Sequence, residues 1–494
     1  MLKYRPQNDR MWDAWAVPHN GCYHLLHLQT RLSDGEPDPA GWGHAVSPDL
    51  IHWRECPPVL PPSGSENDRL YRYTGCTVEE NGRFAAFSTR RNARGDQVIG
   101  VSFSSDLFHW NDRPDPVLTP DPALFLAAPA PGWGNTDCRD MTVLSLPGGG
   151  YCGYFAAVEA GGEHRGVIGA ARSDDLIHWY NQQIVYRTAD VSIVEMPEVF
   201  PFGNRYVLMF LTGQSYGRIW LHEPFLSRGT GLATADSPFG PFTESEPGEL
   251  LLAGPPESGF SCRTVFAEGK RRALYVDPGC GDARLSLPKT VGADANGRPR
   301  LFYADDLCAA LRQSPIPAAL AHLPPSSFAW NIRGGDFRTT GSGLYGKTVG
   351  QSQQAALFST AAPFWEITAT LSCRAVRCGF VFYEADKNGK PINPYAARCV
   401  GITVEPDAGR IAVIRLPDGQ PLAVRRWAVS ASGGRLRVLL TDNTVEAYWN
   451  DELVITAGTP LPNACLPGCF VTGGEAAFDE LGIWPLSRKE TASG

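Results

Sequence analysis

Three carboxylic acids stand in short sequence contexts that could carry acid–base chemistry. They are Asp13 in MWDAW, Asp140 in CRDMTVL and Glu195 in EMPEVF. Cleavage of a glycosidic bond needs one carboxylic acid that donates a proton and a second carboxylate that attacks as a nucleophile or activates water. Because the three residues are far apart in the sequence, this chemistry requires a fold that brings separate segments to one place.

An internal repeat indicates such a fold. The strings SPDLIHW (Ser47–Trp53), SSDLFHW (Ser104–Trp110) and SDDLIHW (Ser173–Trp179) share one template, and ADSPFGPF (Ala235–Phe242) is a degenerate fourth copy. Copies spaced by roughly 60 residues, with short strands between them, are typical of propeller blades. The repeated Asp and Trp are interpreted as residues that cap and pack a turn between outer strands, without a part in the chemistry.

Between the copies, short stretches alternate apolar and polar residues and are bounded by turn residues. The predicted strands are Cys22–Gln29, Arg83–Arg90, Gly150–Val158 and Arg205–Gly213, with a further hairpin over Arg263–Asp277. The pattern predicts a five-bladed β-propeller over residues 1–312. The innermost strands of a propeller start near its central channel, so Asp13, Asp140 and Glu195, each at the start of a blade, are expected to meet there.

The second part of the chain has a different pattern. A short helix is predicted over Ala304–Arg312, and residues 313–327 contain four prolines, which is typical of a linker. Over residues 328–494, alternating segments and an Asn450-Asp451 hairpin turn indicate antiparallel strands and hence a β-sandwich. The predicted fold class is therefore all-β, a five-bladed β-propeller followed by a C-terminal β-sandwich. The sandwich is interpreted as a packing partner of the propeller, with polysaccharide binding as the alternative.

Length, charge and cysteine content bound the other possibilities. The 494 residues suffice for two large domains, and the formal net charge of −8 comes without a Lys/Arg stripe, so no nucleic-acid partner is expected. No stretch has the pattern of a signal peptide or a membrane span, so a cytoplasmic protein without a membrane partner is expected. The 13 cysteines form no paired C-x-x-C and are expected to be reduced, with Cys373–Cys378 and Cys465–Cys469 as alternative bridges. The oligomeric state stays open.

Histidines are the remaining residues that invite a chemical interpretation. Most lie in the blade motifs and lack the spacing of metal ligands. We therefore predict no metal and no other cofactor. The histidines considered are His24, His27, His44, His52, His109 and His178.

A longer stretch, WGHAVSPDLIHWRECPPVLPP (Trp42–Pro62), resembles the first-blade signature of glycoside hydrolase family 32, the invertase and fructanase family. Other motifs are similar to elements of that family in the same order. MWDAW resembles the element with the nucleophilic Asp, YTGC (Tyr73–Cys76) the Phe-Ser-Gly-Ser element, RDM (Arg139–Met141) the Arg-Asp-Pro element and EMPE (Glu195–Glu198) the Glu-Cys-Pro-Asp element. The resemblance covers the whole chain, because that family also joins a five-bladed propeller to a β-sandwich.

The resemblance implies roles for individual residues. Asp13 would be the nucleophile, Glu195 the general acid and then base, and Asp140 a transition-state stabiliser that holds sugar hydroxyls. Glu195 must then be protonated near neutral pH, which burial beside other carboxylates favours, whereas Asp13 must stay ionised. The implied sugar subsite is lined by Gln29, Trp42, Tyr73, Thr74 and Arg139.

The implied activity is that of a retaining hydrolase, which releases terminal β-D-fructofuranosyl residues from sucrose or fructo-oligosaccharides through a covalent glycosyl-enzyme intermediate and without a cofactor. The sequence departs from the family around Asp13, where the preceding Asn is absent and Ala14-Trp15 replace Pro-Asn-Gly. Three alternatives therefore stay open. They are an inverting arabinofuranosidase-type hydrolase with Asp13 as base, a fructosyl-transferring enzyme, and a carbohydrate-binding protein that has lost turnover.

Overall fold

The computed structural model describes most of the chain. The described residues are 1–33, 40–65, 68, 71–91, 95–127, 137–161, 165–188, 194–212, 228–245, 250–254, 261–277, 283–316, 320–321, 335–348, 353–390, 399–416, 419–429, 433–442, 444–459 and 464–488. Within them the regular structure is almost entirely β-strand. The helical residues described are α1 (Asp305–Cys308) and the 3₁₀ turn η2 (Ala309–Leu311), which confirm the predicted short helix.

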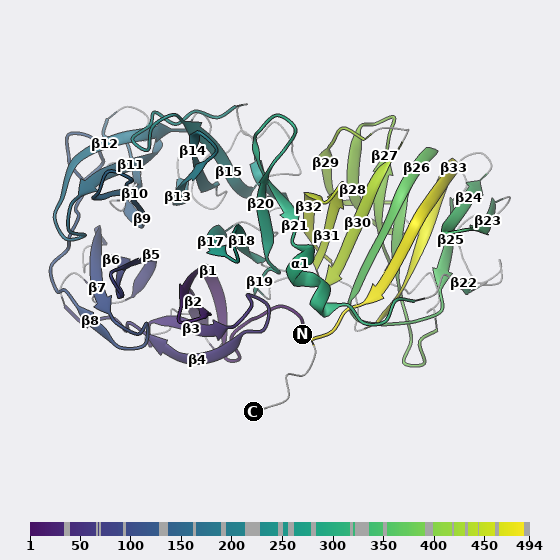
Figure 1. Ribbon diagram of the computed structural model, residues 1–494, viewed down its shortest axis with the longest axis horizontal. Coiled ribbons are helices and arrows are strands. Elements are labelled where there is room, and N and C mark those ends of the chain that lie inside the picture. The colour runs from purple at the N-terminus through teal and green to yellow at the C-terminus, as the bar shows by residue number, and fades with distance from the viewer. Residues whose placement is uncertain are drawn as a thin grey trace.

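Four antiparallel four-stranded sheets form the propeller, and they follow one another around a ring in the order of the sequence (Figure 1). In each sheet the strands are ordered as in the chain, from the centre of the ring outward. The sheets are β1 (Asp9–His19), β2 (Cys22–Arg31), β3 (Trp42–Ser47), β4 (Arg54–Val59); β5 (Arg72–Glu80), β6 (Arg83–Arg91), β7 (Gln97–Ser104), β8 (Trp110–Asp112); β9 (Cys138–Ser145), β10 (Tyr151–Val158), β11 (Gly166–Ser173), β12 (Trp179–Arg187); and β13 (Val194–Phe202), β14 (Arg205–Thr212), β15 (Arg228–Ala235), β16 (Leu250–Gly254). The four strands predicted between the repeats are confirmed as β2, β6, β10 and β14.

The next strands continue the up-and-down pattern beside the ring. The predicted hairpin over Arg263–Asp277 is confirmed as β17 and β18, which pair antiparallel, and β18 pairs with β20 and β20 with β21. β21 then meets β32 where Phe302 pairs with Glu452. The bounds are β17 (Ser261–Ala267), β18 (Lys270–Asp277), β19 (Arg284–Leu285), β20 (Lys289–Ala293) and β21 (Pro299–Tyr303).

The C-terminal strands lie beyond α1 on the other side of the molecule (Figure 1). Two long strands, β26 and β33, pair along most of their length. The predicted Asn450-Asp451 turn is confirmed between β31 and β32, with φ angles of 52° and 64° that suit a tight hairpin. The bounds are β22 (Leu320–Ala321), β23 (Gly335–Thr340), β24 (Gly343–Thr348), β25 (Gln353–Phe358), β26 (Trp365–Glu384), β27 (Cys399–Glu405), β28 (Arg410–Leu416), β29 (Pro421–Arg426), β30 (Gly434–Thr441), β31 (Thr444–Trp449), β32 (Glu452–Gly458) and β33 (Cys465–Pro485).

The predicted linker over residues 313–327 is described only at residues 313–316 and 320–321. At the latter, the two residues of β22 pair with β25. Residues 317–319 and 322–327 lie outside the described residues, as does residue 328, where the second domain is predicted to begin.

The repeated Asp-Leu-x-His-Trp motif forms a turn between the third and fourth strands of a sheet. The Asp49 carboxylate accepts hydrogen bonds from the backbone N–H groups of Ile51 and His52, and the Trp53 indole N–H donates to the carbonyl of Leu50. The copies at Asp106 and Asp175 repeat the carboxylate contacts. The motif therefore caps a turn, as predicted from the sequence. In a tight turn some backbone N–H groups have no backbone carbonyl to bind, and the Asp carboxylate accepts their hydrogen bonds instead.

Charged groups are buried where the C-terminal strands pack against the propeller side. The carboxylate of Glu446 on β31 accepts hydrogen bonds from the hydroxyls of Tyr275 and Tyr448 and lies 3.1 Å from Lys289 Nζ. Lys289 and Glu446 are each 1% exposed. Burial raises the pKa of Glu446, but the charges of Lys289 and Lys3 and the hydrogen bonds from Tyr275 and Tyr448 outweigh it and lower the pKa to about 2. The contact between the propeller side and the C-terminal strands thus includes a buried ion pair, in which the Lys289 ammonium and the Glu446 carboxylate are both charged.

We expect Glu446→Gln to lower the free energy of unfolding by about 3 kcal/mol, because it leaves a buried ammonium without its carboxylate. Urea denaturation at pH 7 measures the change. Because the folded pKa is depressed, the stabilisation is present above the unfolded value of 4.5 and is lost as the pH falls from there toward about 2. The difference between the two proteins should therefore shrink over that range.

Glu475→Gln is the matched control. Its carboxylate accepts a hydrogen bond from Tyr345, lies 3.8 Å from Lys347 and is 33% exposed, so the substitution should cost much less than Glu446→Gln. Equal losses in the two variants would contradict the role assigned to burial at Glu446.

Candidate active site

Four innermost strands of the propeller carry a β-bulge near their start. In β1 the pairing moves from Met11–Gln29 to Ala14–His27, so that Trp12 and Asp13 together oppose one residue of β2. The register shifts in the same way at Thr74 in β5, at Asp140 and Met141 in β9, and directly after Glu195 in β13. β17 pairs with β18 without such a shift. A bulge re-aims the side chains beside it, and each predicted carboxylate lies at or directly before one: Asp13 and Asp140 are bulge residues, whereas Glu195 is the last paired residue before the bulge of β13.

Asp13 is held by the neighbouring sheet. The hydroxyl of Thr74 on β5 donates a hydrogen bond of 2.5 Å to Asp13 Oδ2. Thr74 is 2% exposed, and its own carbonyl accepts a hydrogen bond from the hydroxyl of Thr89 on β6. A donated hydrogen bond favours the ionised form of a carboxylate, which is the form that a nucleophile or a base requires.

Asp140 is fixed from both sides. Its φ angle of 58° lies in the left-handed region, and its backbone N–H donates to Thr89 Oγ1 at 2.8 Å. Its carboxylate accepts a hydrogen bond of 3.1 Å from the backbone N–H of Met196, whose φ of 51° is also left-handed. The two left-handed residues, Asp140 and Met196, are therefore hydrogen-bonded to each other across neighbouring sheets. The buried hydroxyl of Thr89 bonds both the Thr74 carbonyl and the Asp140 N–H, and so connects β5 with β9.

One guanidinium faces three carboxylates. Arg139 Nη2 donates to Glu195 Oε1 at 3.2 Å, Nη1 donates to Asp137, and Nε lies 3.7 Å from Asp140 Oδ2. The Arg139 side chain is 12% exposed. Arg139 thus lies in direct contact with two further predicted residues, Asp140 and Glu195. Thr74, which binds Asp13, is linked to Asp140 through the hydroxyl of Thr89.

The pKa values of two carboxyl groups are raised. Burial is the main cause for both Asp140 and Glu195, and the charge of Asp13 adds to it, while Arg139 acts in the opposite direction. Removing a carboxylate from water disfavours its charged form. The site therefore favours a proton on at least one of these carboxyls, which is the state required of a general acid.

Gln29 and Trp42, the other predicted subsite residues, are buried at 2% and 0% exposure. Gly43 allows the side chains of β2 to pack there, since a Cβ at that position would stand 2.5 Å from Gln29 Oε1. The indole N–H of Trp42 donates to the carbonyl of Arg72 at 3.2 Å. With its face covered, Trp42 can influence a sugar subsite only through the backbone of β5 that it holds. Tyr73 is half-buried and packs edge-on against Tyr71.

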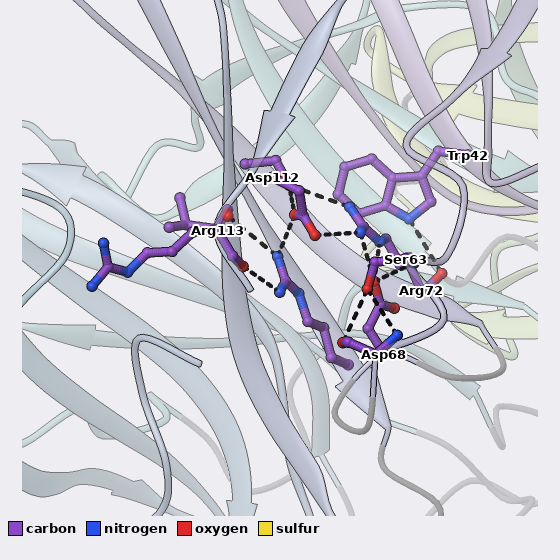
Figure 2. Close-up of polar contacts among 10 residues, drawn as sticks. Trp42, Ser63, Asp68, Arg72, Asp112 and Arg113 are labelled. Carbon is purple, nitrogen blue, oxygen red and sulfur yellow. Dashed lines mark hydrogen bonds and ion pairs between the residues drawn. The ribbon is translucent and has the colours of Figure 1, made fainter. Parts of the chain in front are cut away.

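An ion network, buried at Asp68 and Arg72 and partly exposed at Asp112, holds the start of β5 (Figure 2). Tyr73 and Thr74 follow Arg72 directly in this strand. Asp68 accepts two hydrogen bonds from Arg72, of 2.9 and 2.6 Å, and one from the backbone N–H of Ser63. Asp112 lies between Arg72 and Arg90, at 2.9 and 2.7 Å. The strand that supplies the hydroxyl for Asp13 is therefore anchored by charges that are themselves paired.

Sequence reasoning missed two residues of the site, Thr89 and Asp137. Asp137 stands two positions before Arg139, close enough in the sequence to have suggested a pair. Thr89 gave no signal, because it lies in the middle of an ordinary strand and acts only through the bulges opposite it.

Among the described residues, no group of three or more His, Cys, Asp or Glu side chains is arranged to hold a metal ion. The described part of the chain also contains no helix that is long and apolar enough to cross a membrane.

Known proteins share both the sequence motifs and the fold. Residues 13–223 match the model of the glycosyl hydrolases family 32 N-terminal domain. A β-fructofuranosidase, insoluble isoenzyme 5, of Oryza sativa subsp. japonica is 29% identical over 194 residues, 37% of this chain and 33% of that protein. Sucrose-6-phosphate hydrolase of Escherichia coli is 27% identical over 201 residues, 39% of each chain. The matches thus span only about a third to two fifths of these relatives.

Solved structures extend the likeness in fold to nearly the whole chain. A family 32 β-fructofuranosidase of Bombyx mori superposes with a TM-score of 0.72 at 16% identity, covering 99% of this chain and 93% of the other. An exo-inulinase of Aspergillus awamori gives a TM-score of 0.70 at 15% identity, covering 98% of both chains. At such identities the likeness shows the fold alone.

We expect Thr89→Val to lower the free energy of unfolding by about 2 kcal/mol, because it leaves the Asp140 N–H and the Thr74 carbonyl without their buried partner. Denaturant unfolding measures the loss. Thr89→Ser keeps the hydroxyl and should lie much closer to the wild type. A serine variant as unstable as the valine variant would show that the methyl group, and not the hydrogen bonds, matters at this position.

Proposed function

We propose that this chain, which through residues 13–223 belongs to glycoside hydrolase family 32, releases terminal β-D-fructofuranosyl residues from sucrose or fructo-oligosaccharides with retention of configuration. The observation that carries the proposal is the contact of Arg139 with both Asp140 and Glu195, with Asp13 close enough for its charge to raise the pKa of both carboxyls. The names of the relatives, among them a β-fructofuranosidase and a sucrose-6-phosphate hydrolase, point to the same class of sugar.

The proposed reaction uses two carboxyl groups in turn. Glu195 donates its proton to the oxygen of the leaving sugar while ionised Asp13 attacks the anomeric carbon, so that the glycosidic bond breaks as a fructosyl–Asp13 ester forms. Ionised Glu195 then takes a proton from water, which displaces Asp13 and restores both groups. The raised pKa of Glu195 suits the first step, and the Thr74 hydroxyl that donates to Asp13 suits its role as an anion.

Asp140 is proposed to hold sugar hydroxyls. One of its oxygens is already bound by the Met196 N–H, so the carboxylate is fixed in place before substrate arrives. A group that is preorganised in this way loses little freedom when it binds, which favours the transition state over a mobile alternative.

The finer features of the fold are part of the same proposal. β17, β18, β20 and β21 repeat the up-and-down order of the four sheets and would close the ring as a fifth blade. The strands from β24 to β33 enclose a core of their own that includes Trp365, Phe380 and Val438, which supports a β-sandwich. The described cysteines are all free, in line with a reducing, cytoplasmic location.

The test is release of sugar from a panel of fructosides and arabinofuranosides. We expect fructose from sucrose or inulin-type oligosaccharides, and we expect Asp13→Asn and Glu195→Gln each to reduce kcat by a factor of about 10³ or more, because each removes a group that forms or breaks a bond. NMR of the nascent fructose should show the β-anomer. The α-anomer would contradict the retaining mechanism.

Other outcomes separate the alternatives. Release of arabinose would keep the carboxylate trio and change the sugar. Fructosyl oligosaccharides that lengthen at high sucrose concentration would indicate transfer to a sugar acceptor.

Glu198→Gln is the matched control for Glu195→Gln and should retain most of the activity. Glu198 lies on the same strand as Glu195, but its carboxylate is bound by the backbone N–H and hydroxyl of Thr264. A wild type without activity on the whole panel would favour a binding protein.

A further inference from the structure

We propose that Asp137 is a positioning residue for Glu195, because it binds one end of the Arg139 guanidinium and so limits the positive charge that this arginine directs at Glu195. The inference rests on the proposed function and deepens it. It assigns a task to a fourth carboxylate of the site, one that neither contacts the proposed bond nor belongs to the trio.

The single positive charge of Arg139 is shared between two carboxylates, which bind different nitrogens of its guanidinium. Asp137 takes the hydrogen bond from Nη1, and Glu195 takes the one from Nη2 at 3.2 Å. Asp137 and Arg139 are 9% and 12% exposed in their side chains, whereas Glu195 is 25% exposed. The pair of Asp137 and Arg139 is thus the more closely held of the two, and the contact with Glu195 is the weaker one.

The surroundings of Glu195 contain more negative than positive charge. β9 contributes Arg139 and Asp140, β1 contributes Asp13, and Asp137 precedes β9. The strand paired with Glu195 on the other side, β14, places Leu211 opposite it.

The nearest cation of β17 is used elsewhere. Arg263 Nη1 donates to the carbonyl of Pro197 at 2.5 Å. Arg139 is therefore the cation in contact with Glu195 among the described residues, and Asp137 already neutralises part of it.

The direction of the effect follows from these charges. Burial raises the pKa of Glu195 most, Asp13 and Asp137 raise it further, and Arg139 lowers it. Replacing Asp137 by Asn removes a like charge and frees Arg139 to act more fully on Glu195. Both changes stabilise the ionised form of Glu195. The pKa of Glu195 should therefore be lower in the variant, so that on raising the pH the general acid loses its proton earlier than in the wild type.

The experiment is the pH dependence of kcat/KM for the fructoside that the wild type cleaves best. We expect the alkaline limb of Asp137→Asn to move about one pH unit lower, a loss of about tenfold on that limb. Asp137→Glu keeps the charge and should restore most of the wild-type profile. Asp115→Asn, which removes an exposed carboxylate in the segment before β9, should leave the profile unchanged.

Two results would overturn the inference. A loss of kcat at every pH with the limb unmoved would assign Asp137 a structural role. A raised KM with an unmoved limb would assign it a contact with the sugar. If Asp137→Asn fails to fold, Asp137→Ser removes the same charge with a smaller side chain and takes its place.

A readout without turnover keeps this inference separate from the proposed function. Protein labelled with ¹³C at the glutamate carboxyl carbon is titrated by NMR, and Glu195→Gln identifies the resonance. A lower Glu195 pKa in Asp137→Asn, found in a protein inert toward every fructoside, would sustain the role of Asp137 and contradict the proposed function. An enzyme that cleaves fructosides but shows the same Glu195 pKa with and without Asp137 would support the proposed function and contradict the role of Asp137.

Discussion

The bulges near the start of β1, β5, β9 and β13 are the constraint on which the site depends. A regular innermost strand would send alternate side chains to its two faces, and Asp13, Asp140 and Glu195 would not converge. The extra residues come at a cost, because Asp140 and Met196 adopt left-handed backbone that L-residues avoid by about 1–2 kcal/mol each. Hydrogen bonds between neighbouring sheets, from Thr74 to Asp13 and from Met196 to Asp140, offset it. The same bonds that make the bulges tolerable also orient the carboxylates.

Concentrating carboxylates in this way makes the site electrostatically unfavourable as long as all are ionised. Asp137, Asp140 and Glu195 meet a single guanidinium, that of Arg139, the charge of Asp13 acts on two of them, and burial reduces the screening by water. The remaining repulsion is relieved most simply by a proton on one carboxyl, which is how a fold can keep an acid protonated near neutral pH. The ion network of Asp68, Arg72 and Asp112 anchors the start of β5, the strand whose Thr74 binds Asp13.

The parts of the fold that were predictable from the sequence are those set by neighbouring residues. The Asp-Leu-x-His-Trp turns, the Asn450-Asp451 hairpin and the alternating strands each depend on a few consecutive residues. Asp13, Asp140 and Glu195 were singled out because they open blades in distinctive contexts, and the structure brings Asp140 and Glu195 to the same guanidinium. Thr89 was out of reach, because its role depends on bulges in other strands that change the register by one residue. The burial of Trp42 was missed for a related reason, since a motif shows which residues recur and not which face they turn to.

Trp12 separates the backbone of the β1 bulge from the side chains that stand on it. It shares the bulge with Asp13, and the pairing of β1 with β2 sets that backbone, since both residues oppose a single residue of β2. Trp12 is 44% exposed, and its indole N–H donates to Thr30 at 3.1 Å, so a large aromatic side chain stands next to Asp13 in the sequence and at the surface. MWDAW resembles a family element that has Asn at this position, so the surface beside Asp13 is expected to differ from that of the family. A bulge can thus fix the backbone of one residue while its neighbour in the same bulge determines the adjoining surface.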